Sequence, residues 1–443
     1  MNTSFFQELL GSIAERGRAL IDRSPARPAD DQAATPETLE GLCQALVSGR
    51  GEASGVALAR QVLERYAAEP MPARLDFFRV LARDFDPDRA AIRTAWQAYE
   101  QDPSPASLQR LLTVVEPPRQ ELFRRLNLAP GGTAALVRMR EDLIRHGGKE
   151  PLLSGVDHDF AHLFGSWFNR GFLVLRRIDW STPADILERL IRYEAVHEIQ
   201  GWDDLRRRVQ PSDRRCYAFF HPSLLDEPLI FVQVALTREI PASIQSLLAE
   251  EREVLPADQA TTAVFYSITN CQLGLRGVSF GNFLIKQVVG DLSRDLPGLR
   301  TFVTLSPAPG FAAWAEPQLT GELAALREPD WRADPKLVER LRPALLGLGA
   351  AYFLRAKGSG GKPLDPVARF HLGNGARLER LNFLGDTSRK GMQGAHGLMV
   401  NYLYDLRFIE ANHEAFANEG TVVAADAVRR LLPASKPAPE SVA

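Results

Sequence analysis

The sequence predicts a fold of the α plus α/β class, with an all-helical domain over residues 1–160 and a mixed α/β domain over residues 161–443. The length of 443 residues allows two or three domains. Apolar residues recur at helical spacing up to about residue 150, and β-rich runs begin only near residue 172. An apolar share of 45% with 24% charged residues is ordinary for a globular chain that buries a sizeable core.

The first part predicts a series of helices separated by Pro and Gly. A short amphipathic helix precedes a linker near residues 24–37 that is rich in Pro, Ala and Asp. Thr35 is then a candidate N-cap before a proline at the first helical position. The absence of a fixed repeat period argues against a solenoid. Apolar stripes lie at residues 56–66, 75–81, 92–99, 108–114 and 136–144.

The second part alternates strand and helix patterns. The runs at 216–220 and 228–237, joined by a short polar turn, predict an antiparallel hairpin. An almost wholly apolar helix is predicted over 343–355, with Pro343 in its first turn. The last dozen residues predict a disordered tail. The other expected elements are strands at 172–178, 261–269 and 301–305, helices at 182–194 and 281–295, and short strands near 381–384 and 398–406.

Charge and cysteine content exclude several classes of protein. A net charge of −2 gives no basis for binding nucleic acid or an anionic membrane. The longest apolar run, residues 343–354, is shorter than the roughly 20 residues of a membrane-spanning helix. Cys43, Cys216 and Cys271 form no CxxC pair and no even framework. This cysteine pattern, together with an N-terminus that lacks a signal-peptide pattern, favours a cytoplasmic location. Whether oxidation of a cysteine regulates assembly is left open.

The segment QLGLRGVSFGNFLIK, residues 272–286, lies between a predicted strand and a predicted helix. Its small residues allow close backbone approach, and the free N–H groups at a helix N-terminus attract phosphate. The spacing matches neither a dinucleotide-binding fingerprint nor an NTP-binding loop. A tight turn that binds nothing is an equally good interpretation.

Three further segments carry candidate catalytic side chains. Ser306 lies in TLSPAPGF, directly after a strand, where Pro307 favours an extended serine. His371 lies in PVARFHLGNGA before a glycine turn, where it can be half exposed with a pKa near neutrality. Tyr404, in GMQGAHGLMVNYLY, can supply a phenolic donor. A turn-capping serine, a packed histidine and a core tyrosine are the structural alternatives.

A pair of histidines also has the spacing of a metal site. His158 and His162 share one helical face, as in zinc-dependent proteases. The residue after the first histidine is the shorter Asp159 rather than glutamate, and no third ligand is evident. We therefore expect no metal.

The order of three strands, glycine turn, helix and strand resembles the core of the GNAT-type acyltransferase superfamily. In that superfamily the turn holds the pyrophosphate of coenzyme A, so Arg276 and Gly277 resemble the start of the phosphate loop and Gly281 lies near its end. Five segments together resemble the malonyl-CoA decarboxylase family, over about residues 165–406. They are CYAFFHPSLLDEPLIFVQVALT, AVFYSITNCQLGLRGVSFGNFLIKQVV, TLSPAPGF, PVARFHLGNGA and GLMVNY.

This resemblance implies a GNAT-like catalytic domain that converts malonyl-CoA into acetyl-CoA and CO₂ without a metal or organic cofactor. It also implies a helical domain that assembles a homodimer or homotetramer. Ser306 and His371 become the catalytic pair, and Ser279 departs from the family pattern because members can carry an acidic residue there. The implied coenzyme A loop comprises Arg276, Gly277, Val278, Ser279, Phe280, Gly281 and Asn282.

The chemistry suits these side chains. Loss of CO₂ leaves an electron pair that is delocalised onto the thioester oxygen as an enolate, so the site needs an oxyanion donor and a proton donor. We expect Ser306 to orient or polarise the malonyl group and His371 to protonate the α-carbon, with these roles shared or reversed as the alternative. Tyr404 is a candidate third member. An acyltransferase and a non-catalytic acyl-CoA sensor remain as alternatives, and acceptance of methylmalonyl-CoA is open.

Overall fold

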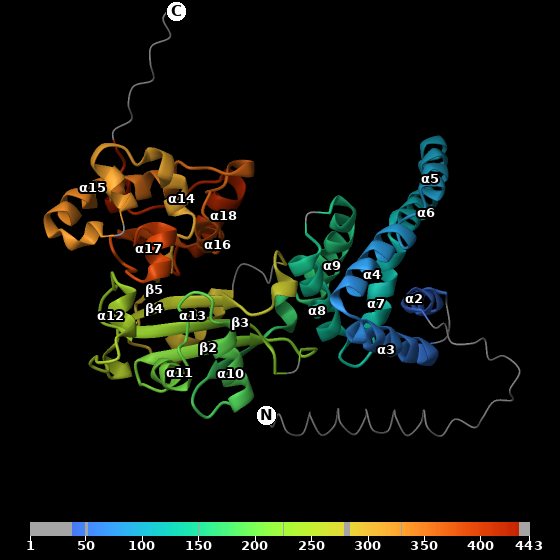
Figure 1. The fold of residues 1–443 in the computed structure, drawn as a ribbon, viewed down its shortest axis with the longest axis horizontal. Helices are drawn as coiled ribbons and strands as arrows, with labels where there is room; N and C mark the ends of the chain where they lie inside the picture. The colour runs from blue at the N-terminus through green and yellow to red at the C-terminus, as the bar shows by residue number, and fades with distance from the viewer. Residues whose placement is uncertain are drawn as a thin grey trace, which may run out of the picture.

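The computed structural model describes residues 38–48, 52–148, 150–224, 226–278, 284–328 and 330–433. The linker predicted near residues 24–37 and the chain from residue 434 onward lie outside these ranges. In the described part, helices occupy the N-terminal region and a mixed α/β region follows (Figure 1). This order confirms the predicted α plus α/β class.

The N-terminal region is built from amphipathic helices around an aromatic core. Ser104 caps one of them by accepting a hydrogen bond from Ser107 N, and Pro105 follows at the first helical position. The rings of Phe123 and Phe160 stack within the core with centroids 4.1 Å apart. The helices are α2 (Leu39–Val47), α3 (Glu52–Ala68), α4 (Met71–Asp84), α5 (Arg89–Gln101), α6 (Pro105–Val115), α7 (Pro118–Asn127), α8 (Gly132–His146) and α9 (Ser154–Trp167).

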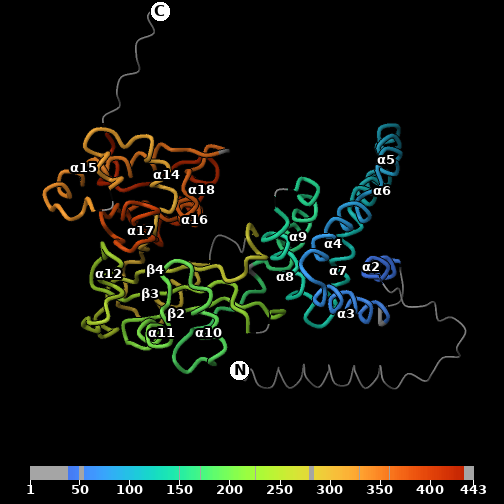
Figure 2. Tube along the Cα trace, viewed as in Figure 1, coloured from blue at the N-terminus to red at the C-terminus, as the bar shows by residue number. Residues whose placement is uncertain are grey.

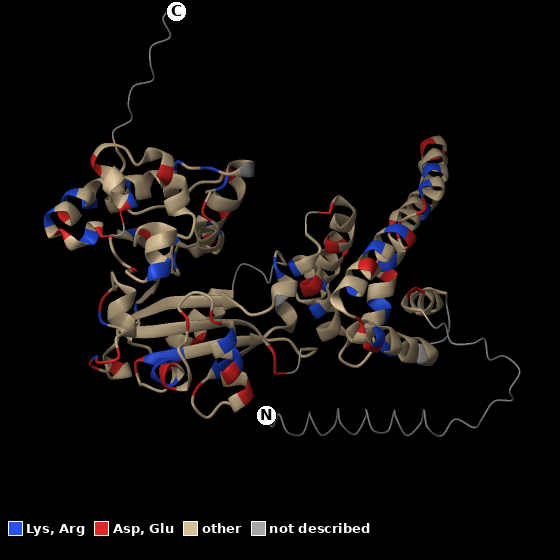
Figure 3. Cartoon of the chain, viewed as in Figure 1, with Lys and Arg blue, Asp and Glu red and all other residues tan. Residues whose placement is uncertain are grey.

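Helices α5 and α6 form a hairpin that projects from the rest of this region (Figures 1 and 2). Ala95 is buried in α5, whereas α6 has no buried residue. Leu108, Leu112 and Val115 are exposed apolar side chains at positions i, i+4 and i+7 of α6. Basic and acidic residues are interspersed along the helices of this region (Figure 3).

In the residues that the structure describes, the α/β region is organised around an eight-stranded mixed sheet. The strand order is β1-β2-β3-β4-β5-β8-β6, with β7 paired to β8. The strands are β1 (Val174–Ile178), β2 (Arg214–Phe220), β3 (Pro228–Thr237), β4 (Thr262–Asn270), β5 (Thr301–Thr304), β6 (Ser306–Pro307), β7 (Arg377–Asn382) and β8 (Met399–Leu403). The helices are α10 (Ala184–Tyr193), α11 (Trp202–Val209), α12 (Ile244–Leu248), α13 (Leu284–Asp295), α14 (Phe311–Ala315), α15 (Pro335–Leu354), α16 (Pro366–Gly373), α17 (Arg389–Ala395), α18 (Ile409–Glu419) and α19 (Asp426–Arg429).

Strands β4 and β5 form the parallel pair of this sheet, and α13 connects them. Their register runs from Thr262 opposite Thr301 to Phe265 opposite Thr304. Strand β5 ends there, while β4 continues to Asn270. The segments after both strands leave from the same edge of the sheet because the strands are parallel. This unit has the order of strand, turn, helix and strand that the sequence predicts.

Most predicted strands agree with the structure to within a few residues, but one helix is longer. Helix α15 begins at Pro335, so Pro343 lies inside the helix instead of in its first turn. Asp334 caps the true start by accepting a hydrogen bond from Lys336 N. Pro343 faces solvent, where water can satisfy the carbonyl that loses its helical partner. None of the helices in the described ranges is long and apolar enough to cross a membrane.

Candidate active site

A buried chain of hydrogen bonds links four side chains at the centre of the α/β region. Ser306 Oγ donates to Thr304 Oγ1 at 2.9 Å and lies 3.1 Å from His371 Nε2. His371 Nδ1 lies 2.8 Å from the hydroxyl of Tyr404. All four residues are buried. The three predicted catalytic residues are therefore brought together from segments that are far apart in sequence.

The sheet positions Thr304 and Ser306. Ser306 pairs with Val400 of β8. Thr304 Oγ1 accepts a second hydrogen bond from Tyr402 N at 3.1 Å, and Thr304 O accepts one from the side-chain amide of Asn401 at 2.7 Å. Strand β8 thereby fixes the short strand β6 that carries Ser306.

Helix α16 positions His371. Its N-cap is Asp365, whose side chain accepts a hydrogen bond from Ala368 N at 2.8 Å, and Pro366 opens the helix. The imidazole stacks on the ring of Tyr402 with centroids 4.6 Å apart. Capping fixes the helix and stacking fixes the imidazole plane.

The hydrogen-bond directions define one tautomer of His371. Ser306 has one hydroxyl proton and gives it to Thr304, so Ser306 can only accept from Nε2–H. With Nε2 protonated in a neutral ring, Nδ1 accepts the hydroxyl proton of Tyr404. The chain of proton donors runs from Tyr404 through His371 and Ser306 to Thr304.

Burial keeps this chain uncharged. Loss of solvation lowers the pKa of His371 from 6.5 to about 3, because the charged imidazolium is disfavoured away from water. Burial also raises the pKa of Tyr404 well above its usual 10. The expectation of a half-exposed histidine with a pKa near neutrality is therefore wrong, since only 3% of His371 is exposed.

Sequence reasoning missed the residues that support the catalytic candidates. Asp365 is buried, its pKa is raised above 3.8 by burial, and it accepts a hydrogen bond from the Tyr352 hydroxyl at 3.2 Å. The hydroxyl of Tyr402 is buried and, among the described residues, has no hydrogen-bond partner. Thr304 and Tyr402 each lie two residues before a candidate, at Ser306 and Tyr404. Side chains two residues apart in an extended segment lie on the same face. This spacing is the sequence signal that points to Thr304 and Tyr402 as neighbours of the catalytic candidates.

The predicted coenzyme A loop is described only in part. Arg276, Gly277 and Val278 follow a short 3-10 helix, η4 (Leu273–Leu275). Gly277 has φ of 80°, a left-handed conformation that glycine adopts without strain. Ser279, Phe280, Gly281 and Asn282 lie outside the described residues. The described turn follows β4 and Ser306 follows β5, so both leave from the same edge of the sheet.

The candidate metal pair lies on the surface of α9. His158 and His162 are both exposed, and their ring centroids are 6.5 Å apart. Asp159 turns inward instead and forms a buried ion pair with Arg119, with the carboxylate 2.5 Å from Nε. Within the described ranges, no group of three or more potential ligands could hold a metal.

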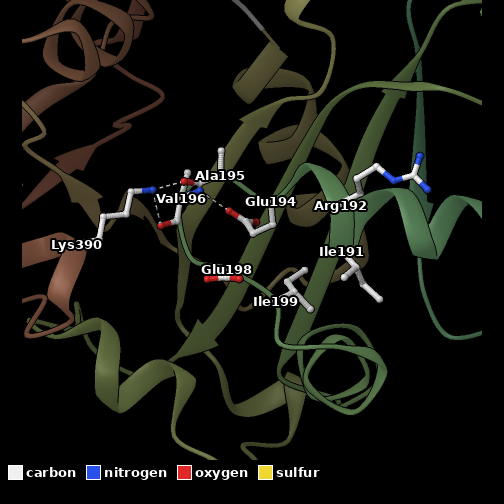
Figure 4. A pocket seen from close by; sticks show the side chains of 8 residues that line it. All are labelled: Ile191, Arg192, Glu194, Ala195, Val196, Glu198, Ile199 and Lys390. Atoms are coloured by element: carbon white, nitrogen blue, oxygen red, sulfur yellow. Dashed lines mark hydrogen bonds between the residues drawn. The ribbon is translucent and has the colours of Figure 1, made fainter.

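A second polar cluster lies on the other side of β4. Glu194 is buried and accepts hydrogen bonds from Ser267, Thr269 and the side chain of Gln233. Lys390 of α17 donates to the backbone carbonyls of Ala195 and Val196, which directly follow Glu194 (Figure 4). The adjoining cavity of about 430 Å³ is lined by Ile191, Arg192, Glu194, Ala195, Val196, Glu198, Ile199 and Lys390.

A helical region, a mixed sheet with a parallel β4–α13–β5 unit and a buried Ser–His–Tyr chain define an α plus α/β protein with a candidate catalytic site. Family comparison specifies it further. Residues 85–168 match the malonyl-CoA decarboxylase N-terminal domain, and residues 171–441 match the malonyl-CoA decarboxylase C-terminal domain. The chain belongs to the malonyl-CoA decarboxylase family, and the predicted activity, decarboxylation of malonyl-CoA, is confirmed.

Individual relatives agree with this assignment. The chain is 36% identical over 402 residues to malonyl-CoA decarboxylase, mitochondrial, of Anser anser anser, covering 80% of this chain and 79% of the relative. It resembles the crystal structure of malonyl-CoA decarboxylase from Rhodopseudomonas palustris, with 59% identity, a TM-score of 0.86 and coverage of 88% and 98%. The corresponding structure from Agrobacterium vitis gives 56% identity, a TM-score of 0.85 and coverage of 89% and 99%.

Proposed function

We propose that Ser306, His371 and Tyr404 carry out the decarboxylation of malonyl-CoA as one hydrogen-bonded unit. The observation that carries this proposal is the continuous contact from Ser306 Oγ to His371 Nε2, 3.1 Å, and from His371 Nδ1 to the Tyr404 hydroxyl, 2.8 Å. These distances are within hydrogen-bond reach for proton transfer. Loss of CO₂ needs a hydrogen-bond donor to the developing oxyanion, and the step that follows needs a proton donor to the α-carbon.

In the first step, the bond between the α-carbon and the carboxylate breaks, and its electron pair moves into the thioester to form an enolate. Ser306 turns its hydroxyl from Thr304 to the malonyl group and stabilises the developing negative charge. A donor placed in this way contributes about 2.7–4 kcal/mol to transition-state stabilisation in comparable sites. The CO₂ leaves, and the thioester serves as the electron sink.

In the second step, His371 transfers its Nε2 proton to the α-carbon and gives acetyl-CoA. Nδ1 takes the hydroxyl proton of Tyr404 at the same time, so the imidazole stays neutral. Tyr404 then regains a proton from solvent, which balances the one proton that the reaction consumes. The lowered pKa of His371 supports this relay, because a neutral ring can pass a proton from one nitrogen to the other.

In this proposal, the described part of the predicted coenzyme A loop binds the coenzyme A moiety of malonyl-CoA. Gly277 brings the backbone close to the phosphates, and N–H groups of the turn bind them. Arg276 adds a positive charge at the same turn. The remaining residues of the predicted loop, Ser279, Phe280, Gly281 and Asn282, keep their proposed role in phosphate binding.

Assembly, domain division and location are also proposals. We propose that the chain forms a homodimer or homotetramer through its helical region, because α6 exposes Leu108, Leu112 and Val115 on one face. We propose that the helical domain, predicted to end at residue 160, extends to the end of α9 at Trp167, with the catalytic domain beyond it. Three free, buried cysteines support a cytoplasmic location.

A substrate time course tests the proposed mechanism. Purified protein is incubated in EDTA with malonyl-CoA and no acceptor, and acetyl-CoA and CO₂ are quantified by mass spectrometry. Stoichiometric products from the native chain, with strong losses in Ser306→Ala and His371→Ala, support the mechanism. Full activity in both variants would contradict it.

A further inference from the structure

Arg140 of helix α8 reaches from the helical region to the turn that precedes the proposed phosphate site. Its Nη1 donates to the backbone carbonyls of Gly274 at 2.8 Å and Arg276 at 2.9 Å. Only 4% of Arg140 is exposed. A buried guanidinium that contacts two carbonyls of one turn restricts the conformation of that turn.

The guanidinium is fixed from its other side by an ion pair. Arg140 Nε donates to Asp157 Oδ1 of helix α9 at 2.9 Å. Two helices of the helical region therefore hold one planar group, and this group holds the turn. Lysine cannot reproduce the arrangement, because its single ammonium lacks the fixed fork of donors.

Close backbone packing locks the same contact. A Cβ atom built on Gly274 would lie 2.0 Å from the carbonyl oxygen of Val137, which is one helical turn before Arg140. Glycine at position 274 is therefore required for α8 to approach η4. The hydrogen bonds of Arg140 and this steric fit act on the same short segment.

The geometry of a trans peptide links this contact to ligand binding. The carbonyl of Arg276 and the N–H of Gly277 belong to one peptide unit and point in opposite directions. Arg140 holds that carbonyl, so the Gly277 N–H points away from the helical region. This is the N–H that the proposed phosphate site uses at its glycine.

We propose that Arg140 is a positioning residue for the coenzyme A phosphates, acting through the carbonyls of Gly274 and Arg276. The proposal rests on the proposed phosphate-binding function of residues 276–278. The helical region then contributes directly to substrate affinity, in addition to any role in assembly. Arg140 orients the peptide that binds the ligand.

The test compares Arg140→Ala and Arg140→Lys with Arg138→Ala, an exposed arginine on the same helix. For each full-length protein, kcat and KM are measured with malonyl-CoA and with malonyl-pantetheine, which lacks the phosphates. The Kd of free coenzyme A is measured by calorimetry, and thermal unfolding identifies variants that fail to fold. Gly277→Val reports separately on the phosphate site.

We expect Arg140→Ala to raise KM for malonyl-CoA and the Kd of coenzyme A by about tenfold, as expected for loss of charged hydrogen bonds. Arg140→Lys should show a smaller rise, and Arg138→Ala should behave as the native chain. For the Arg140 variants, kcat with malonyl-CoA and both kcat and KM with malonyl-pantetheine should change by less than about twofold. Such a change is smaller than the effect of losing one charged hydrogen bond.

Other outcomes separate the two proposals. If Gly277→Val weakens coenzyme A binding and both Arg140 variants do not, the role of Arg140 is refuted while the phosphate site stands. If none of these variants changes coenzyme A binding, the phosphate site is wrong and the role of Arg140 falls with it. Equal losses with malonyl-CoA and malonyl-pantetheine would also refute a role in phosphate positioning.

Discussion

The imidazole of His371 stacks on the phenol ring of Tyr402, with centroids 4.6 Å apart and an angle of 26° between the planes. This contact leaves the two ring nitrogens free to reach Ser306 and Tyr404 in the plane of the imidazole. The ring therefore combines an apolar environment, which keeps it neutral, with a donor or acceptor at each nitrogen.

Removal of the imidazole should abolish most of the activity. We expect His371→Ala to lower kcat by about 10²-fold or more, the range of a lost general acid. His158→Ala removes an exposed histidine and serves as the control. Acetyl-CoA formation is followed by mass spectrometry, and a loss of less than about threefold, far below that range, would exclude His371 from the mechanism.

Tyr404→Phe should reduce kcat while leaving KM nearly unchanged. The substitution keeps the ring but removes the hydroxyl that donates to His371 Nδ1, so the imidazole loses its internal proton source. We expect about a tenfold loss, because one hydrogen bond of about 1.4 kcal/mol or more disappears in the transition state. Tyr402→Phe removes a hydroxyl that has no partner in the described chain and preserves the stacked ring. Equal losses in the two variants would contradict the relay.

The pH profile should lack a bend from His371. Burial lowers its pKa to about 3, so the ring loses its extra proton as the pH rises through that value and is neutral at all higher pH. The raised pKa of Tyr404 keeps the phenol protonated at neutral and mildly alkaline pH. We expect kcat/KM for malonyl-pantetheine to vary by less than about twofold between pH 5.5 and 8.5. A bend near 6.5 that disappears in His371→Gln would show that the histidine titrates at its ordinary pKa.

A bulky residue at position 277 should act on substrate binding. Gly277 has φ of 80°, so Gly277→Val introduces backbone strain and a side chain where the phosphates approach. We expect KM for malonyl-CoA to rise by about tenfold or more, with a smaller effect on kcat, as for other losses of phosphate contacts. Steady-state kinetics and coenzyme A calorimetry measure the two effects. A lower kcat with unchanged coenzyme A affinity would contradict this assignment.

The exposed face of α6 should control assembly. Leu112, with 56% of its surface exposed, lies at the centre of that face. We expect Leu112→Asp to shift the chain toward the monomer, because burying a carboxylate at an apolar interface is unfavourable. Gln109→Asp adds the same charge elsewhere on the exposed helix. Light scattering after size-exclusion chromatography gives the mass, and an unchanged assembly in Leu112→Asp would show that this face is not an interface.

The predictable part of the fold is the part with local signals. Strands β2 and β3 follow from β-branched and aromatic runs around a polar turn, and the pattern of strand, glycine turn and helix predicts β4, the turn and α13. The expected start of α15 at residue 343 is wrong, because Pro343, though typical of a first helical turn, lies inside the helix. The stronger signal was the N-cap Asp334, followed by Pro335, where the helix begins.

The environment of the site could not be predicted because it is made by long-range contacts. The sequence placed Ser306, His371 and Tyr404 in candidate segments, but the depth of His371 depends on how α16 packs against β8. Its burial, its pKa and its tautomer all result from that packing. Arg140 gave no signal, since it is one of several arginines on an amphipathic helix and the two carbonyls that it contacts lie more than a hundred residues away.

The contact between Gly274 and Val137 limits how the two halves of this chain can be recombined with those of relatives. The backbone approach at this point excludes any side chain at position 274. A chimera that joins the helical half of one relative to the catalytic half of another must therefore carry both surfaces of the contact from the same parent. The two family models meet between residues 168 and 171. A chimera joined at that boundary works only if the contact between α8 and η4 is preserved.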